Sequence, residues 1–168
     1  MKIRSEEARD VSTVRIVHEA AFPTDAEARL VDRLRAAGKA VISLVAEIDA
    51  RIVGHVLFSP VTIEGVRTNG ALGLAPVAVL PTDQRSGIGS ALIRAGLDEC
   101  RRRGCPFVVV LGEPDYYRRF GFRRAAELEL GNEYAADEAF RVIELRRGGI
   151  PPEGGVVRYA PELAELEE

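Results

Sequence analysis

Residues 84–90, QRSGIGS, lie between the apolar run LGLAPVAVL (residues 72–80) and the segment ALIRAGLDECRRR. A run that is apolar at successive positions is typical of a strand in the centre of a sheet covered on both faces. Gly87 and Gly89 allow the backbone to turn sharply after such a strand. Amide N–H groups at the start of a helix attract anions, phosphate above all. The pattern predicts a strand, a phosphate-binding loop and a helix, in that order.

The segment after the loop has the clearest helical pattern in the chain. Leu92, Ile93, Leu97 and Cys100 recur at the spacing of one apolar helix face. Gly96 lies on the same face, and glycine lowers helix propensity by about 1 kcal/mol relative to alanine, so we expect it to pack closely against the sheet. The buried strand FVVVLG follows at residues 107–112. Strand, helix and strand predict a right-handed parallel βαβ unit.

The remaining elements follow from hydrophobic period and turn residues. No repeat or long linker divides the chain, so we expect a single domain over residues 1–168. Helices are expected at 11–22, 27–37, 90–103 and 114–121, and strands at 41–48, 52–63, 72–80, 107–112, 122–130, 139–145 and 156–161.

Composition excludes several classes of partner. The net charge is −3 and the pI is near 5.6, which argues against nucleic acid or an anionic membrane as a partner. No apolar stretch approaches the roughly 20 residues that span a bilayer, and the start of the chain has no signal-peptide core, so we expect a cytoplasmic protein. Cys100 and Cys105 are the two cysteines; with His18 and His55 they give no zinc spacing, so we expect buried thiols and no metal.

The loop offers three interpretations that involve no particular family. A Walker loop needs a lysine after its second glycine, and Ser90 stands there instead. A dinucleotide fingerprint needs a third glycine where this chain has Leu92. It should also open the first βαβ unit of the chain, whereas several other elements precede this one. A glycine-rich turn without a ligand is the structural alternative.

The pattern Gln84-x-x-Gly87-x-Gly89, after an apolar strand and before an amphipathic helix, resembles motif A of the GNAT superfamily of N-acetyltransferases. A second match is YYRRFGF at residues 116–122, which resembles the Tyr-x-x-x-Gly-Phe ending of the family. The segment LVAEIDARIVGHVLFSPV also looks like the hairpin that precedes motif A. Together these matches cover most of the chain up to Arg123.

The resemblance implies an α/β fold: a central mixed, mostly antiparallel twisted sheet of six to seven strands, with helices on both faces and a splayed parallel strand pair. It also implies acetyl-coenzyme A as cosubstrate, with its pantetheine arm lying in the gap between the splayed strands. The N–H of Val77 would face the thioester carbonyl and Val79 would pair with the pantetheine amide. The residues expected to bind the cofactor are Val77, Ala78, Val79, Gln84, Arg85, Ser86, Gly87, Ile88, Gly89 and Ser90.

Acetyl transfer to an amine releases a coenzyme A thiolate that needs a proton. The family's acid tyrosine precedes the Gly-Phe pair by four positions, which is Tyr117 here; Tyr116 is about 100° away on the same helix. The alternative for Tyr117 is ordinary packing of its ring.

The general base stays open among Glu113, Glu47, His55 and a chain of waters. Glu113 is expected to cap the helix that begins at Pro114, and His55 is expected to be a hydrogen-bonded core histidine. The sequence does not identify the amine acceptor or the oligomeric state, and a homodimer is possible. A non-catalytic acyl-CoA sensor on the same fold is the alternative function.

Overall fold

The structure is a computed structural model and describes residues 1–64, 66 and 68–167. The chain divides into two compact units, which are treated separately below. Three elements run through both units: strands β3 (Arg51–Ile63) and β4 (Leu72–Val79) and helix α3 (Ile88–Arg102). Unit 1 comprises Met1–Ser59, Ala75–Gly96 and Pro161–Glu168, and unit 2 comprises Pro60–Leu74 and Leu97–Ala160. The two units share continuous elements. The single domain expected over residues 1–168 stays a prediction.

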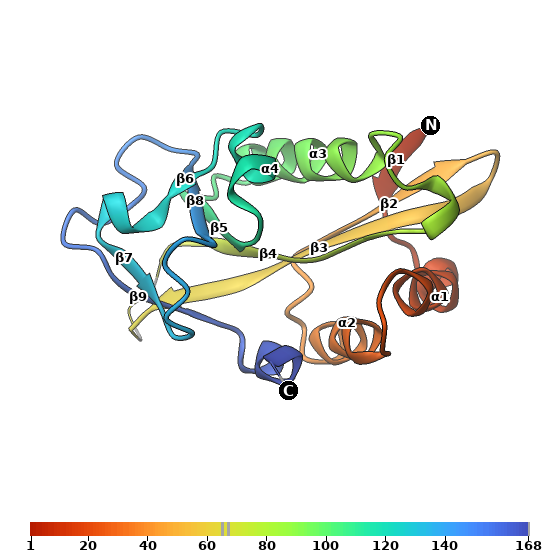
Figure 1. Cartoon of the computed structure of the whole chain (residues 1–168), viewed down its shortest axis with the longest axis horizontal. Coiled ribbons are helices and arrows are strands. Elements are labelled where there is room, and N and C mark those ends of the chain that lie inside the picture. Colours follow the sequence, from red (N-terminus) through yellow and green to blue (C-terminus); the bar gives the residue numbers. More distant parts are fainter. Residues whose placement is uncertain (65, 67, 168) are drawn as a thin grey trace. The chain divides into compact units, whose positions relative to one another are not determined.

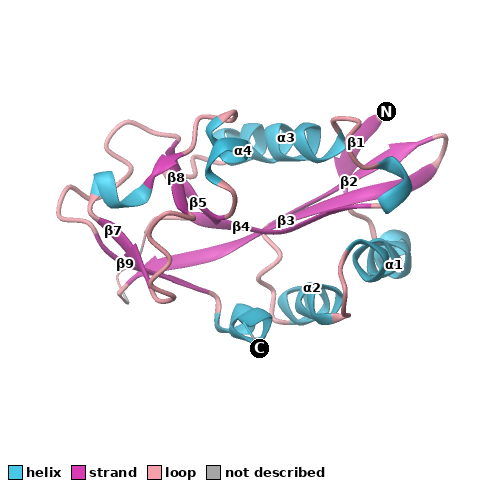
Figure 2. Ribbon diagram, in the orientation of Figure 1, coloured by secondary structure: helices cyan, strands magenta, loops and turns pink. Residues whose placement is uncertain are grey.

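Unit 1 is built on an antiparallel arrangement of strands. β1 (Lys2–Ser5) pairs with β2 (Ile42–Ile48), which forms a hairpin with β3. Helices α1 (Val11–Ala21) and α2 (Ala26–Ala36) lie on one face of these strands, and the first part of α3 lies on the other (Figures 1 and 2). The side chains of successive residues in a strand point to opposite faces, so β3 serves both layers. His55 contacts His18 of α1, whereas Gly54 and Phe58 face α3.

Two glycines let α3 approach the sheet closely. A Cβ on Gly96 would lie 2.3 Å from Cε1 of Phe58, and one on Gly54 would lie 3.0 Å from Cδ1 of Leu92. Real Cβ contacts do not occur at the first of these distances, so only glycine fits at position 96 without a shift of the Phe58 ring. The expectation that Gly96 packs closely against the sheet is confirmed.

Unit 2 contains the parallel pair of the βαβ unit. β4 pairs with β5 (Phe107–Leu111) in a parallel ladder whose register covers only Leu72–Val108 and Gly73–Val109. β8 (Phe140–Glu144) pairs antiparallel with β5 and with the short β6 (Arg123–Arg124). β9 (Gly155–Tyr159) pairs antiparallel with the end of β3 and parallel with β7 (Leu130–Asn132). A ladder this short in β4 and β5 is what a splayed pair requires.

The fold class predicted from the sequence, a mixed and mostly antiparallel sheet with helices on both faces, is confirmed. The strand count differs: the described residues form nine strands rather than six to seven. β1 was not anticipated, because four residues give too short an alternation to detect. The segment expected as one strand at 122–130 is divided into β6, a 3₁₀ turn at Ala125–Leu128 and the start of β7.

Candidate active site

The loop between β4 and α3 is shaped by its own side chains. The Gln84 amide donates a hydrogen bond of 2.9 Å to the Val79 carbonyl, and the Ser86 hydroxyl donates one of 2.5 Å to the Asp83 carbonyl. Arg85 and Gly87 both have positive φ angles, 63° and 87°. Arg85 pays a steric penalty for this conformation, whereas glycine does not. The two side-chain bonds and the two left-handed residues together fix the course of the chain into α3.

The same loop is open to solvent where a ligand would bind. Residues 84–87 are exposed, whereas Ile88 is only 4% exposed and anchors the start of α3 in the core. The Ala91 N–H donates to the Gly87 carbonyl at 3.0 Å, which closes the first turn of α3. Amides at the start of any α-helix lack carbonyl partners within that helix, and the helix dipole adds partial positive charge there. The geometry suits a diphosphate.

The end of β4 lies directly before this loop in the same unit. Val77 and Val79 are half-buried, and Ala78 between them is buried. The Leu80 N–H donates to the Val53 carbonyl at 2.8 Å, which ties the end of β4 to β3. Pro76 has no N–H and cannot donate to a ladder. The structure therefore brings together in unit 1 all ten residues expected to bind the cofactor; their contacts with acetyl-CoA stay predictions.

Tyr117 belongs to unit 2, on the short helix α4 (Pro114–Arg118). Glu113 caps this helix as expected: its carboxylate accepts hydrogen bonds from the N–H groups of Tyr116 (2.8 Å) and Asp115 (3.3 Å). The Tyr117 ring lies against Gly112, where a Cβ would be 2.2 Å from the ring. Only glycine leaves room for the ring in this position.

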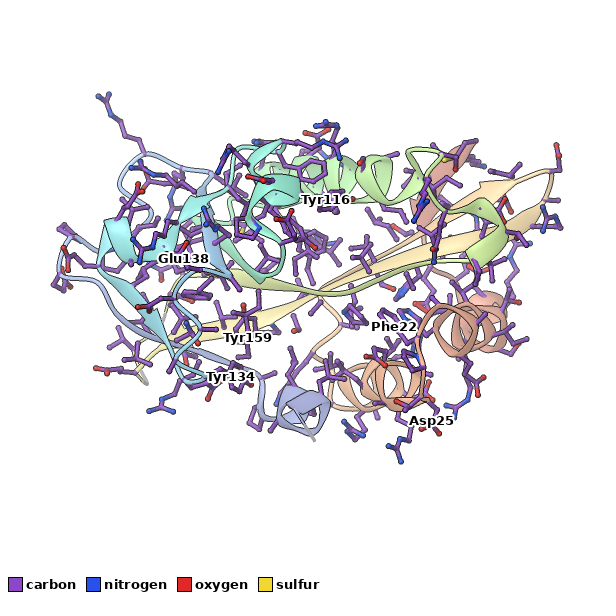
Figure 3. The ribbon with its side chains drawn as sticks, in the orientation of Figure 1. Phe22, Asp25, Tyr116, Tyr134, Glu138 and Tyr159 are labelled. Atoms are coloured by element: carbon purple, nitrogen blue, oxygen red, sulfur yellow. The ribbon has the colours of Figure 1, made fainter. Side chains whose placement is uncertain are left out.

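Tyr116 and Tyr117 have different surroundings, as the sequence predicted. Tyr117 is buried, and this burial, together with the neighbouring Tyr116, raises its pKa to about 12. Tyr116, labelled in Figure 3, is half-buried, and the Arg119 guanidinium lies over its ring at 5.2 Å. The two rings meet edge to face at 5.0 Å. The role of Tyr117 as general acid is not tested by these contacts and stays a prediction.

The other candidates for the general base also have partners. Glu47 lies 3.4 Å from the Arg4 guanidinium. His55 is fully buried and hydrogen-bonded, so the interpretation of this residue as a core histidine is confirmed. Burial lowers the pKa of His55, and the ring is neutral at physiological pH.

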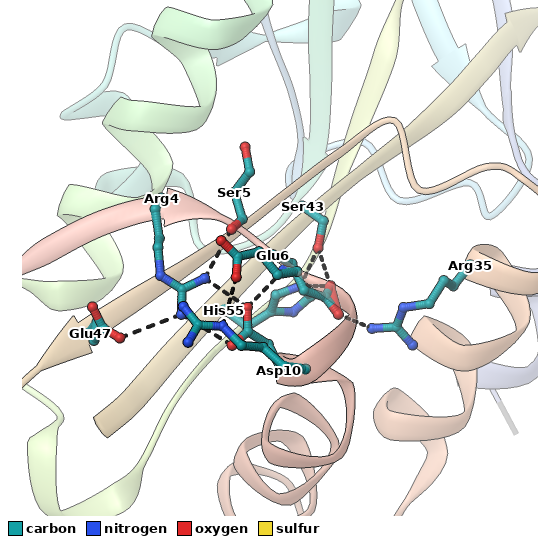
Figure 4. Close-up of polar contacts among 10 residues, drawn as sticks. Arg4, Ser5, Glu6, Asp10, Arg35, Ser43, Glu47 and His55 are labelled. Carbon is teal, nitrogen blue, oxygen red and sulfur yellow. Dashed lines mark hydrogen bonds and ion pairs between the residues drawn. The ribbon is translucent and has the colours of Figure 1, made fainter. Parts of the chain in front are cut away.

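His55 belongs to a buried polar chain that sequence reasoning missed (Figure 4). The His55 Nδ1 lies 2.8 Å from the His18 Nε2 on α1, and its Nε2 lies 2.8 Å from the Ser43 hydroxyl on β2. The Ser43 hydroxyl donates to the Glu6 carboxylate at 2.5 Å, and Arg35 of α2 donates to the same carboxylate. The histidines are far apart in sequence, and only the pairing of α1 with β3 brings them together.

Burial and hydrogen bonds determine the protonation states of the residues in this polar chain. Burial and, to a smaller extent, the nearby His55 lower the pKa of His18 to about 3. Burial opposes ionisation of Glu6, but the neighbouring His55 imidazole, the hydrogen bond from Ser43 and the charge of Arg35 outweigh it and lower the pKa to about 2. The chain therefore joins two neutral rings to a single ion pair. Phe22, labelled in Figure 3, stacks on His18 at 6.0 Å.

Among the described residues, no group of three or more His, Cys, Asp or Glu side chains is placed to hold a metal ion. None of the described helices is long and apolar enough to cross a membrane.

The short parallel ladder and the glycine loop at the start of α3 define the class of fold that the sequence motifs predict. Comparisons with known proteins agree. A sequence model described as "Acetyltransferase (GNAT) domain" matches residues 2–125. The uncharacterized N-acetyltransferase YhbS of Escherichia coli K12 is 36% identical over 161 residues, which covers 95% of this chain and 96% of that protein.

Two solved structures are similar over nearly their whole length. The YhbS protein from Escherichia coli in complex with CoA has a TM-score of 0.92 and 34% identity, and covers 97% of this chain and 91% of its own. A GNAT family acetyltransferase from Brucella melitensis in complex with acetyl-CoA has a TM-score of 0.81 and 39% identity, with 96% and 97% covered. The chain belongs to the GNAT family of acetyltransferases, and it is therefore an acyltransferase, as its sequence motifs predicted.

Proposed function

We propose that this protein binds acetyl-CoA and transfers its acetyl group directly to a primary amine of a small molecule or peptide. The exposed loop of residues 84–87 at the buried start of α3 carries the proposal, because it offers backbone N–H groups to a diphosphate. The complexes of the similar proteins with CoA and acetyl-CoA support the same ligand. A cytoplasmic location is part of this proposal.

In the proposed reaction, the amine nitrogen attacks the thioester carbon and forms a tetrahedral intermediate. The Val77 N–H would donate to the oxyanion of that intermediate, at a position where a preorganised donor is most effective. Collapse breaks the carbon–sulfur bond, and the coenzyme A thiolate takes a proton from the Tyr117 hydroxyl. The amine nitrogen loses its extra proton to a base, so that the products are an amide and a neutral thiol.

The raised pKa of Tyr117 has two opposite consequences for this step. The hydroxyl stays protonated throughout the physiological range, so a proton is always available. Transfer from a group with a pKa of about 12 to a thiolate whose conjugate acid is near 8.5 is nevertheless uphill. The phenolate formed would therefore be short-lived and would regain a proton from solvent.

The base in this proposal is a chain of waters. Glu113 is occupied in capping α4, Glu47 is paired with Arg4, and His55 has no exposed surface. None of the three side chains is therefore poised to take a proton from an incoming amine.

The test combines binding with turnover. Acetyl-CoA and CoA should raise the melting temperature, whereas ATP and NAD should not; a ligand at a hundred times its Kd adds about 2.7 kcal/mol of stability. The release of CoA thiol is then followed across a broad panel of primary amines, with enzyme alone and amine alone as controls. If acetyl-CoA binds but no amine in the panel causes release of CoA, the result would favour a non-catalytic acyl-CoA sensor over an enzyme. A melting shift with NAD alone would overturn the assignment of the loop.

A further inference from the structure

The end of α3 places the two cysteines of the chain side by side. The Gly104 N–H donates to the Arg101 carbonyl at 3.1 Å, and the Cys105 N–H donates to the Cys100 carbonyl at 3.0 Å. Gly104 has a φ of 76°, which glycine adopts without strain. These two bonds form a Schellman ending, in which the residue at the position of Cys105 packs against the residue at the position of Cys100.

The two thiols are in contact with each other and shielded from solvent. Cys100 is 0% exposed and Cys105 is 4% exposed, and neither forms a disulfide in the structure. Hydrogen bonding between the two thiols, together with burial, raises the pKa of Cys100, and the same hydrogen bonding lowers the pKa of Cys105 although burial opposes it. The Cys105 thiol also lies 3.2 Å from the Phe107 carbonyl oxygen, which holds its side chain in place.

Three arginines affect the ionisation of the pair. The charges of Arg101 and Arg103 lower the pKa of Cys100 and the charge of Arg146 lowers the pKa of Cys105, whereas burial raises both pKa values. The Arg146 guanidinium also donates to the Gly104 carbonyl at 3.4 Å, which places its charge beside the turn. Positive charge favours the thiolate, which is the nucleophilic form of cysteine.

We propose that Cys100 and Cys105 are a redox modification site that closes to an intramolecular disulfide when hydrogen peroxide is present. The backbone hydrogen bond between the two residues holds their Cα atoms close together, as a disulfide requires. This inference is independent of the transferase reaction.

The chemistry balances with peroxide as oxidant. One thiol loses its proton, and the thiolate attacks a peroxide oxygen; the oxygen–oxygen bond breaks, the cysteine becomes a sulfenic acid, and the hydroxide that leaves takes up the proton and becomes water. The second sulfur attacks the sulfenic sulfur, the sulfur–oxygen bond breaks, and a second water leaves. The two thiols lose two hydrogen atoms and are oxidised, and one peroxide is reduced to two waters. A dithiol reductant restores the starting state.

The disulfide would form a ring of residues 100–105 that ties the last turn of α3 to the start of β5. The sequence gives this ring a specific signature, because Arg101, Arg102 and Arg103 lie between the two cysteines. Trypsin cuts after each arginine, so peptides 95–101 and 104–118 separate from the reduced protein. In the oxidised protein the same two peptides stay joined through sulfur.

The experiment treats the folded, full-length protein with hydrogen peroxide, blocks the remaining thiols by alkylation and digests with trypsin. We expect a monomer that has lost two hydrogen atoms, and joined peptides 95–101 and 104–118 that separate on reduction. Cys100→Ser and Cys105→Ser are matched controls, because each leaves one thiol and should yield a sulfenic or overoxidised cysteine instead.

Three results would overturn the proposal. The thiols could remain reduced at peroxide concentrations that oxidise a small-molecule dithiol. They could be oxidised singly in the wild-type protein as in the two serine variants. The joined peptides could form only in urea, which would show that the native turn keeps the sulfurs apart and that the contact is packing alone.

Discussion

The imidazole of His18 lies 2.8 Å from that of His55, with Nε2 facing Nδ1, and neither ring is exposed to solvent. The two rings belong to α1 and β3, so this single contact joins a helix to the sheet of unit 1. Both rings are neutral in the folded protein, because burial lowers their pKa values. In the unfolded chain each ring would have an ordinary pKa near 6.5.

This difference predicts acid sensitivity that begins at mild pH. Between pH 6.5 and the folded pKa of about 3 for His18, the unfolded chain binds more protons, so the free energy of unfolding falls as pH falls. Each histidine contributes a slope of up to about 1.4 kcal/mol per pH unit. Glu6 and Asp10, with pKa values lowered to about 2, lose their stabilising effect only below their unfolded values, 4.5 for Glu6 and 3.8 for Asp10.

Urea unfolding of His18→Phe between about pH 6 and pH 5 tests this prediction. The variant should show about half of the wild-type slope, since one of the two titrating rings is gone. Val17→Ala is the matched control, because it removes a neighbouring buried side chain without removing a titrating group. It should lower stability equally at both pH values. An unchanged slope in His18→Phe would show that the pair does not set the acid sensitivity.

Gly96→Ala should destabilise the protein, although alanine is favoured in helices by about 1 kcal/mol. The added Cβ would lie 2.3 Å from the Phe58 ring, and overpacking of this kind costs about 1–3 kcal/mol. Phe58→Leu should remove most of the clash, so Gly96→Ala should be neutral or stabilising in that background. The measurement is a double-mutant cycle of urea unfolding free energies. Stabilisation by Gly96→Ala in the wild-type background would contradict the close contact.

Gly87→Glu should abolish acetyl-CoA binding, because it adds a negative charge where the loop is proposed to hold a diphosphate. Gly87→Ala is the control for backbone strain alone. The φ of 87° penalises any side chain, but a Cβ at this position meets nothing within 4 Å. The alanine variant should lose about 1 kcal/mol of stability and still bind. Isothermal calorimetry decides: equal affinity of the two variants would refute the placement of the diphosphate.

Tyr117→Phe should lower kcat at least tenfold with any amine that the panel identifies, since general acid catalysis is typically worth about 10²- to 10⁴-fold. The Kd for acetyl-CoA should stay nearly unchanged. Tyr116→Phe is the control and should matter much less, because its ring is half-buried beneath Arg119. Full-speed single-turnover chemistry in Tyr117→Phe would rule out the acid role.

The pH profile gives a second measure of the same residue. With a pKa raised to about 12, the Tyr117 hydroxyl remains protonated well above neutral pH. We therefore expect no loss of wild-type kcat from tyrosine ionisation up to about pH 10. An alkaline limb in the wild type that starts near neutral pH and is absent from Tyr117→Phe would show that the hydroxyl ionises far more easily than its burial indicates.

Sequence patterns succeeded where the signal is local and long. The strand, loop and helix around Gly87 follow from glycines and from a period of 3.6 residues, and the cap of α4 follows from Glu113 before Pro114. Close packing of Gly96 was also predictable, because glycine lowers helix propensity and its presence on an apolar helix face indicates close contact with the sheet. In each case the residues that decide the structure are neighbours in the sequence.

Contacts between distant segments were not predictable. His18 fits the apolar face of α1, and nothing in its neighbourhood reveals that β3 will supply a second histidine. Ser43 and Glu6 join the same chain from two further elements. The contact of Cys105 with Cys100 is the exception that a close inspection of the sequence could have found, since Gly104 before Cys105 is the signature of a Schellman ending.

The polar chain that starts at Glu6 has a direction. The ionised carboxylate can only accept, so the Ser43 hydroxyl donates to it, and His55 must donate to Ser43 from Nε2. A neutral ring has one N–H, so the His55 Nδ1 can only accept, and His18 must donate from its Nε2. The His18 Nδ1 is left as a bare lone pair, the end of the chain with no partner among the described residues. The Glu6 carboxylate thus determines the tautomers of both rings. Protonation of Glu6 would remove this constraint, and every hydrogen bond in the polar chain could then reverse its direction.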